Sequence, residues 1–160
     1  MNAYRAKSMR YPWPFALHGF ASLAALALGR ILPMAHEPDA RLTTWAIWSI
    51  GALVIVAGVV LSLWAVRTLL DRHTTVLPNR CSSHLVTCGP FRYTRNPIYL
   101  GYTLIMAGIG LITMNAWFFI IATGTVIFTT LFAVKAEERH LHSRFGFEFE
   151  RYCRSTSRWI

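Results

Sequence analysis

The sequence predicts an all-α, polytopic membrane protein that forms a single domain over residues 1–160, with four membrane-spanning helices. Its 160 residues are 54% hydrophobic and only 14% charged, which is too apolar for an ordinary soluble domain of this size. Four segments approach the about 20 apolar residues that a helix needs to cross a bilayer. The net charge of +9 lies in the segments that flank them, so it indicates a membrane surface and no nucleic-acid partner.

The first two spans are expected at about residues 13–34 and 44–66. The basic start of the chain, "MNAYRAKSMRYPWP", resembles the beginning of a signal peptide. However, the apolar part is long, no small-x-small cleavage site follows it, and further spans come later in the chain. We therefore interpret the first apolar segment as a helix of the folded protein.

The third and fourth spans are expected at about residues 98–114 and 116–134, separated by little more than Asn115. So short a connection predicts a tight antiparallel hairpin. Small residues in both segments would let the two helices approach closely. These residues are Gly101, Ala107, Gly108, Gly110, Ala122 and Gly124.

The distribution of lysine and arginine predicts the orientation. Basic residues crowd the N-terminal tail, the segment between the second and third spans, and the C-terminal tail, whereas the first loop offers only Arg41. The positive-inside rule then places both termini in the cytoplasm. We expect an integral membrane protein of a bacterial-type inner membrane.

The C-terminal tail is predicted to continue the fourth helix, to break near Gly146 and to form a second short helix. Phe149, Tyr152 and Cys153 would share one side of that helix. We expect the aromatic side to face lipid and the arginines to face water, as in an interfacial helix.

One polar stretch at the membrane boundary, "GPFRYTRNPIYLG" at residues 89–101, is unusually rich in functional groups. We call it the cassette. Gly89 permits a sharp bend and Pro97 suits the first turn of a helix. The free N–H groups of that turn can bind a carboxylate, and Arg92 or Arg95 can add charge-assisted hydrogen bonds. The rings of the cassette could receive a flat aromatic ligand.

The adjacent pair Glu137 and Glu138 lies at the end of the fourth span. Alone, the pair would be interpreted as a solvated helix end. In a tight hairpin, however, it would face Arg95, Asn96 and Tyr99 across one pocket. S-adenosylmethionine carries the amine, the carboxylate and the flat aromatic group that such a pocket would bind, while a nucleotide or an amino acid fits in part.

The strings "HLVTCGPFRYTRNPIYLG" and "EERHLHSRFGFEFERY" resemble the isoprenylcysteine carboxyl methyltransferase family, which belongs with the integral-membrane phospholipid methyltransferases. The resemblance begins at about residue 76 and implies a cofactor-binding part at about residues 76–160. It implies S-adenosylmethionine as cofactor, S-adenosylhomocysteine as product, and a lipid-borne or small hydrophobic acceptor at the cytosolic face.

The resemblance also implies roles for individual residues. Glu137 would hold the ammonium group of the cofactor. Arg95, Asn96 and Glu138 are candidates for positioning the reaction. The remaining implied cofactor contacts are Ser83, His84, Leu85, Val86, Gly89, Phe91, Asn96, Pro97, Ile98 and Tyr99.

Two departures from the eukaryotic enzymes of that family concern the acceptor. Asn96 stands where they have histidine, and Ala133 stands where they have an arginine one turn before the acidic pair. The resemblance therefore does not carry the isoprenylcysteine substrate over to this chain. The acceptor atom stays open between a carboxylate, an amine and a thiol.

A carboxylate acceptor needs no general base, whereas an amine or thiol must lose a proton. His84, His140 and His142 are the nearby candidates, and each can equally be a surface or structural histidine. His18, inside the first span, is interpreted as a packing or hydrogen-bonded residue. The cysteines lack a CxxC spacing, so we expect no disulfide framework and no metal site.

Two alternatives remain beside the enzyme: a non-catalytic membrane protein that retains the fold, and a small four-helix transporter. A transporter of that kind needs an acidic residue within a span, and no predicted span has Asp or Glu in its middle. The expected partners are the bilayer and a hydrophobic or lipid-like acceptor. The oligomeric state is left open.

Overall fold

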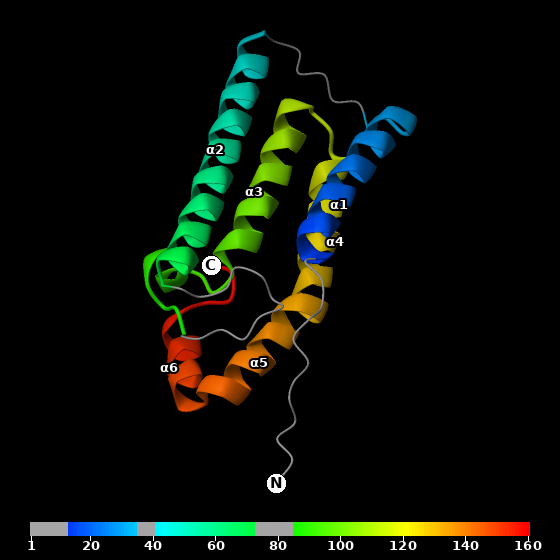
Figure 1. The fold of residues 1–160 in the computed structure, drawn as a ribbon. Coiled ribbons are helices and arrows are strands. Elements are labelled where there is room, and N and C mark those ends of the chain that lie inside the picture. Colours follow the sequence, from blue (N-terminus) through cyan, green and yellow to red (C-terminus); the bar gives the residue numbers. More distant parts are fainter. Residues whose placement is uncertain (1–12, 35–40, 73–84) are drawn as a thin grey trace.

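The computed structural model describes residues 13–34, 41–72 and 85–160, and all regular structure in these ranges is helical (Figure 1). This confirms the predicted all-helical class. The helices are α1 (Trp13–Ile31), α2 (Arg41–Asp71), α3 (Pro97–Ile112), α4 (Trp117–Thr129), α5 (Lys135–Phe145) and α6 (Phe147–Ser155). A short 3₁₀ turn (Gly89–Arg92) precedes α3, and a π-helical stretch (Thr130–Val134) joins α4 to α5.

Three helices of the described chain are long and apolar enough to cross a membrane: α1, α2 and the continuous rod that α4 forms with α5. In that rod the apolar part ends at Val134, where the polar sequence of α5 begins. The helix α3 has 16 residues, which is short for a complete crossing of the hydrocarbon core. Three of the four predicted spans are thus supported, and a fourth stays a prediction.

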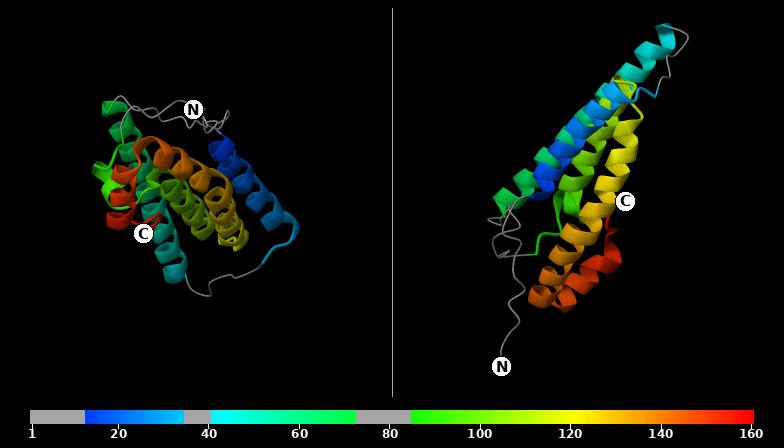
Figure 2. Two further views of the ribbon diagram at one scale, coloured as in Figure 1. Left: turned by 90° about the horizontal axis from the view of Figure 1, so that it is seen from below. Right: turned by 90° about the vertical axis from the view of Figure 1, so that its right-hand side faces the viewer.

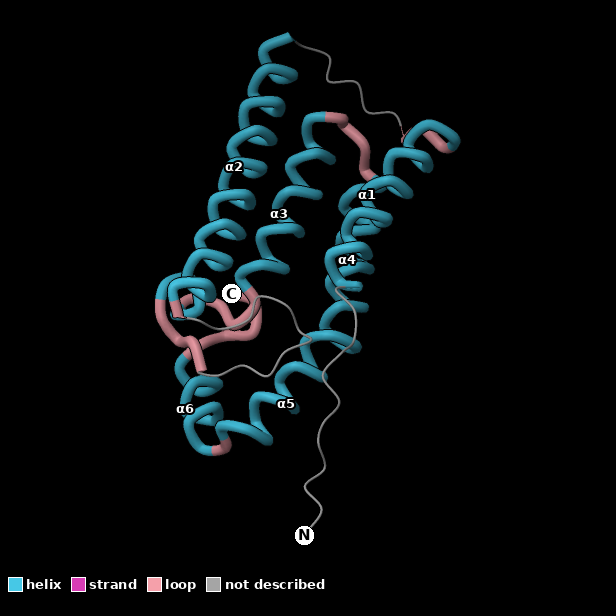
Figure 3. Tube along the Cα trace, viewed as in Figure 1, coloured by secondary structure: helices cyan, strands magenta, loops and turns pink. Residues whose placement is uncertain are grey.

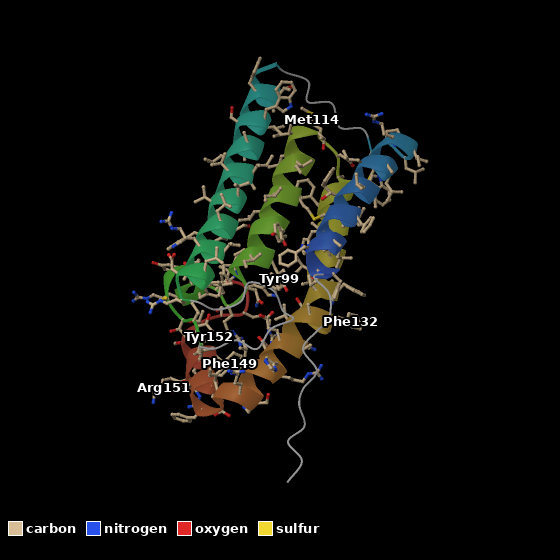
Figure 4. The ribbon with its side chains drawn as sticks, in the orientation of Figure 1. Tyr99, Met114, Phe132, Phe149, Arg151 and Tyr152 are labelled. Atoms are coloured by element: carbon tan, nitrogen blue, oxygen red, sulfur yellow. The ribbon has the colours of Figure 1, made fainter. Side chains whose placement is uncertain are left out.

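Large apolar side chains cover the outside of the bundle. Phe20 is 71% exposed, Leu53 69% and Leu63 63%. Contiguous apolar surface of this kind would make a soluble protein aggregate, but it is what a lipid-facing surface requires. Phe132, which points outward from the lower part of the α4 rod, belongs to the same surface (Figure 4). The chain is therefore an integral membrane protein.

The closest helix pair is α2 with α3, which run side by side in Figures 1 and 2. A β-carbon added at Gly108 would lie 2.7 Å from the carbonyl oxygen of Gly51, and one added at Gly101 would lie 2.7 Å from that of Gly58. The prediction that Gly101 and Gly108 face the fourth helix is therefore wrong. The pattern of small residues predicts close packing but does not say which neighbour is packed.

The predicted hairpin between α3 and α4 is present, with a short connection at residues 113–116 (Figure 3). At this turn Gly110 does pack on α4, because an added β-carbon would lie 2.7 Å from Cβ of Phe118. The side chain of Asn115 accepts a hydrogen bond from the Trp117 N–H (3.0 Å) and donates one to the carbonyl oxygen of Ala25 (2.9 Å). Asn115 thus fastens α1 to the hairpin.

Helix α1 packs mainly along α4. Ala21 and Ala25 of α1 and Phe118 and Ala122 of α4 belong to one buried apolar cluster, which Met106 of α3 completes. Small residues let the helix backbones approach, which is the main source of attraction between helices in lipid. The result places the lower end of α1 beside the first turn of α3.

The polar end of the molecule is made by α5 and α6, which turn back beneath the bundle (Figures 1 and 2). Gly146, at φ +48°, breaks the helix where the sequence predicts. The prediction that the α6 aromatics face lipid is wrong: Phe149 is 4% and Tyr152 7% exposed, and both point into the protein (Figure 4). Tyr152 bonds to the cassette and Phe149 packs on His142 and Tyr152, so α6 is held by the protein rather than by lipid.

Candidate active site

The C-terminal segment at residues 152–158, which we call the strap, is hydrogen-bonded along the cassette. The Tyr152 hydroxyl donates to the carbonyl oxygen of Phe91 at 2.6 Å, and the Arg95 N–H donates to that of Ser157 at 3.0 Å. The Thr156 hydroxyl donates to the carbonyl oxygen of Arg92 at 3.3 Å. These bonds replace solvent for backbone groups of an irregular segment and fix the course of the chain into α3.

Asn96, directly before α3, is 8% exposed and takes part in the same hydrogen bonding between the strap and the cassette. Its side-chain amide donates to the carbonyl oxygen of Arg158 at 2.8 Å, which also accepts from the Thr94 hydroxyl at 3.2 Å. The side chain does not cap α3. Asn96 therefore holds the strap against the start of α3, whatever else it contacts.

Glu138 is at the centre of an ion-pair network. Arg158 donates to both carboxylate oxygens of Glu138, at 2.9 and 2.8 Å, and Arg95 Nη1 lies 3.0 Å from one of them. Arg95 also donates to Sγ of Cys153 at 2.7 Å. The prediction that the acidic pair meets the cassette is confirmed for Glu138 and Arg95. Glu138 is thereby neutralised by two arginines.

Glu137 differs from its neighbour, because among the described residues it has no hydrogen bond and no ion pair. Its side chain keeps contact with solvent, while its charge interacts electrostatically with Tyr99 at the start of α3. Desolvation by the surrounding protein, and then the charge of Glu138, raise the pKa of Glu137 to about 7. Glu137 is therefore an exposed carboxylate that interacts with the start of α3, and none of the described cations pairs with it.

The structure explains why position 89 is a glycine. It adopts φ +62°, and an added β-carbon would lie 2.8 Å from the hydroxyl oxygen of Thr68 on α2. Both the backbone angle and the close contact require glycine. Gly89 thus seats the cassette against α2, and its predicted contact with a ligand stays a prediction.

Of the other predicted cofactor contacts, some lie at the start of α3, some lie before the 3₁₀ turn, and two are not described. Pro97 is fully buried and begins α3, Tyr99 is buried beside it, and Ile98 is half-buried. Leu85 and Val86 are half-buried before the 3₁₀ turn. Ser83 and His84 lie outside the described residues.

A separate hollow of about 430 Å³ borders Glu138. Half of its lining residues are lysine or arginine, and it contains neither Glu137 nor the rings of the cassette, so it is not the predicted cofactor pocket. The lining residues are Lys135, Glu138, Arg139, His142, Phe149 and Arg158.

Sequence reasoning missed the residues of the strap. Arg158 entered the prediction only as a positive charge, and Tyr152 and Cys153 only as one side of a short helix. No spacing pattern links Arg158 to Glu138, because their pairing depends on the turn at Gly146 and on the path of the strap. The aromatic and basic composition near the chain end was the only available signal.

The geometry describes a class: an integral-membrane helical protein whose polar end combines a hydrogen-bonded cassette with one neutralised and one unpaired glutamate. A family profile described as phospholipid methyltransferase matches residues 46–148, from within α2 to the start of α6. The chain belongs to the phospholipid methyltransferase family, as its resemblance predicts, and is thereby placed among membrane methyltransferases. No curated protein and no solved structure gives a match. Helix α1 and the whole strap lie outside the matched range.

Proposed function

We propose that the protein transfers a methyl group from S-adenosylmethionine to a lipid-borne or small hydrophobic acceptor at the cytosolic face of the membrane. The observation that carries the proposal is the unpaired Glu137 beside the cassette. Its neighbour Glu138 is paired with two arginines, so of these two glutamates Glu137 is the one left to bind the ammonium group of a ligand. Carboxylates with raised pKa values are frequent at functional sites.

The first turn of α3 offers the complementary group. Pro97 has no N–H, and Leu100 is the first residue whose N–H bonds back, to the carbonyl oxygen of Asn96 at 3.0 Å. The N–H groups of Ile98 and Tyr99 are therefore left for an acceptor, at the positive end of the helix dipole. A ligand carboxylate fits there, within the same end of the molecule as Glu137.

The cofactor supplies an electrophilic methyl group on a sulfonium and leaves as the neutral thioether. The protein mainly has to align the acceptor with that methyl group and exclude water. Arg95, Asn96 and Glu138 contribute by holding the strap and the cassette in place, which makes them positioning residues. Phe91 and Tyr99 supply aromatic surface near the start of α3.

The basic segments support a cytosolic site in a bacterial-type inner membrane, with both termini in the cytoplasm. The cofactor would enter from the cytosol, and a hydrophobic acceptor would enter from the bilayer between the helices. The apolar surface of α1 and α4 is suited to such an acceptor.

Isothermal titration calorimetry of the purified protein with S-adenosylhomocysteine tests the proposal. Glu137→Gln removes the negative charge and should weaken binding about fivefold or more, because the carboxylate that would pair with the ligand ammonium is lost. Glu148→Gln, at an exposed position on α6, is the matched control and should bind as the wild type does. A folded wild-type protein that binds no S-adenosylhomocysteine would contradict the proposal. Binding without methyl transfer to any acceptor would favour the non-catalytic alternative.

A further inference from the structure

His18 on α1 has a buried ring nitrogen without a partner. The residue is 5% exposed, and its Nδ1 lies 2.7 Å from the carbonyl oxygen of Pro14. Since that oxygen can only accept, Nδ1 carries the proton, and Nε2 presents a lone pair. Nε2 is buried and has no hydrogen-bond partner in the part of the chain that the structure describes. Leaving a buried acceptor unpaired costs free energy, so such a group needs an explanation, and a ligand or a reaction is one.

The ring of His18 adjoins the start of α3. It is parallel to the ring of Tyr99, with centroids 6.4 Å apart, and 5.5 Å from the ring of Tyr102. Tyr99 also interacts electrostatically with Glu137 and offers its N–H to the proposed cofactor site. In Figure 4 Tyr99 lies at the lower end of α3, toward α1. His18 on α1 therefore adjoins the start of α3, next to the proposed cofactor site.

We propose that His18 Nε2 takes the proton of the methyl acceptor, and that this acceptor is an amine or a thiol rather than a carboxylate. This inference rests on the proposed function. The acceptor nitrogen or sulfur forms a bond to the methyl carbon while the bond from that carbon to the cofactor sulfur breaks, and the electron pair stays on that sulfur. The acceptor proton moves to Nε2, which gives an imidazolium with Nδ1–H still bonded to Pro14. A carboxylate acceptor has no proton to give and would leave Nε2 without a role.

The other histidines of the described chain fit this role less well. His142 is exposed and its Nε2 pairs with Glu150 at 2.9 Å. His140 on α5 has two buried ring nitrogens and a partner for neither, so nothing fixes its tautomer. In His18 the bond to Pro14 fixes both the tautomer and the orientation, which is how a histidine is prepared as a base.

A binding experiment tests the position of His18 without knowledge of the acceptor. Sinefungin is an analogue of S-adenosylmethionine in which a carbon bearing an amine replaces the methylated sulfur. Its amine should donate to His18 Nε2, so the wild-type protein in lipid nanodiscs should bind sinefungin about tenfold more tightly than S-adenosylhomocysteine. His18→Phe, which keeps a ring against Tyr99, should lose this preference and bind S-adenosylhomocysteine within about twofold of the wild type.

His140→Phe is the matched control and should keep the preference for sinefungin. The inference about His18 fails, while the proposed function stands, if the wild type binds sinefungin no more tightly than S-adenosylhomocysteine. It also fails if His18→Phe keeps the preference for sinefungin. If the wild type binds neither compound, the proposed function fails and the inference falls with it.

Methyl transfer tests the class of acceptor. Radiolabelled S-adenosylmethionine is offered with dodecylamine, dodecanethiol or dodecanoate, which share one chain length. We expect transfer to the amine or the thiol, and a rate about 100-fold lower in His18→Phe and in His18→Gln, since glutamine can accept a hydrogen bond but cannot hold the proton. The KM for S-adenosylmethionine should be unchanged. Transfer to dodecanoate, transfer to none of the three, or a wild-type rate in His18→Phe would overturn the inference.

Discussion

At the scale of single residues, two consecutive glutamates have opposite environments. Successive residues on a helix point about 100° apart, so Glu137 and Glu138 face different neighbours. Glu138 turns to the strap and the cassette, where two arginines neutralise it. Glu137 is exposed and has no ion-pair partner among the described residues. The sequence predicts that the pair is functional, but only the rotation of α5 decides which carboxylate is available to a ligand.

The network around Glu138 predicts a loss of stability in Glu138→Gln. The side chains of Arg95 and Glu138 are only 14% and 18% exposed, so their charges are poorly solvated. Removing the carboxylate leaves two arginines close together without a counter-charge, which should cost about 2–3 kcal/mol. The Tm of the purified protein, followed by tryptophan fluorescence, should fall by several degrees, whereas Glu148→Gln should leave it unchanged. An unaltered Tm in Glu138→Gln would show that the network is not structural.

The raised pKa of Glu137 predicts a pH dependence of ligand binding. The cationic ammonium of the cofactor favours the ionised carboxylate, which the free protein holds only above about pH 7. Below that pH, the Kd for S-adenosylhomocysteine should rise by up to about tenfold for each pH unit, and above it the Kd should level off. Calorimetry between about pH 5.5 and 8.5 measures this. In Glu137→Gln the slope should disappear, and a slope that persists would assign the titration to another group.

The raised pKa of Glu137 also affects the stability of the ligand-free protein, and here a rise in pH is unfavourable. The folded state holds the Glu137 proton more tightly than the unfolded chain, whose pKa is near 4.5. As pH rises from about 4.5 to 7, the folded state therefore loses stability relative to the unfolded state. A ligand ammonium removes this penalty. Glu137 thus destabilises the empty site in the pH range in which it would bind the cofactor.

At the scale of elements, the α2–α3 pair depends on glycines where the backbones touch. A β-carbon at Gly108 would lie 2.6 Å from a side-chain carbon of Ile55 and 2.7 Å from the carbonyl oxygen of Gly51. Gly108→Leu should therefore separate the helices and destabilise the protein by at least about 2 kcal/mol. Size-exclusion chromatography after heating should show early aggregation. Gly124→Leu is the matched control, since an added β-carbon there meets nothing within 4 Å, and equal behaviour of the two variants would refute this packing.

The elements also show what the sequence could and could not predict. Apolar length predicts the helices within a few residues, apart from α2, which continues to Asp71 rather than ending near residue 66. Glycine at position 146 predicts the break between α5 and α6, because only glycine adopts that backbone angle easily. The neighbour of each small residue could not be predicted, because it depends on how the helices rotate against each other. The strap could not be predicted either, since its contacts join residues about sixty positions apart.

At the scale of the whole molecule, the turn between α3 and α4 lies at one end of the bundle, and the cassette, α5 and α6 lie at the other (Figure 1). Nearly all the described charge is at the second end. The proposed function requires that this end face the cytosol, from which S-adenosylmethionine would enter. The positive-inside rule predicts the same orientation from the basic residues alone.

Cysteine labelling in intact bacterial cells tests this orientation. Cys81, Cys88 and Cys153 are first replaced by serine, which at position 153 keeps an oxygen that can accept from Arg95. Thr113→Cys then places a thiol in the α3–α4 turn, and Arg144→Cys places one on α5, both at exposed positions. A membrane-impermeant maleimide should label the first variant in cells with a permeabilised outer membrane, and the second only after the inner membrane is opened. The reverse pattern would put Glu137 and the cassette outside the cytosol, away from the cofactor. That result would refute the proposed orientation and, with it, methyl transfer at the cytosolic face.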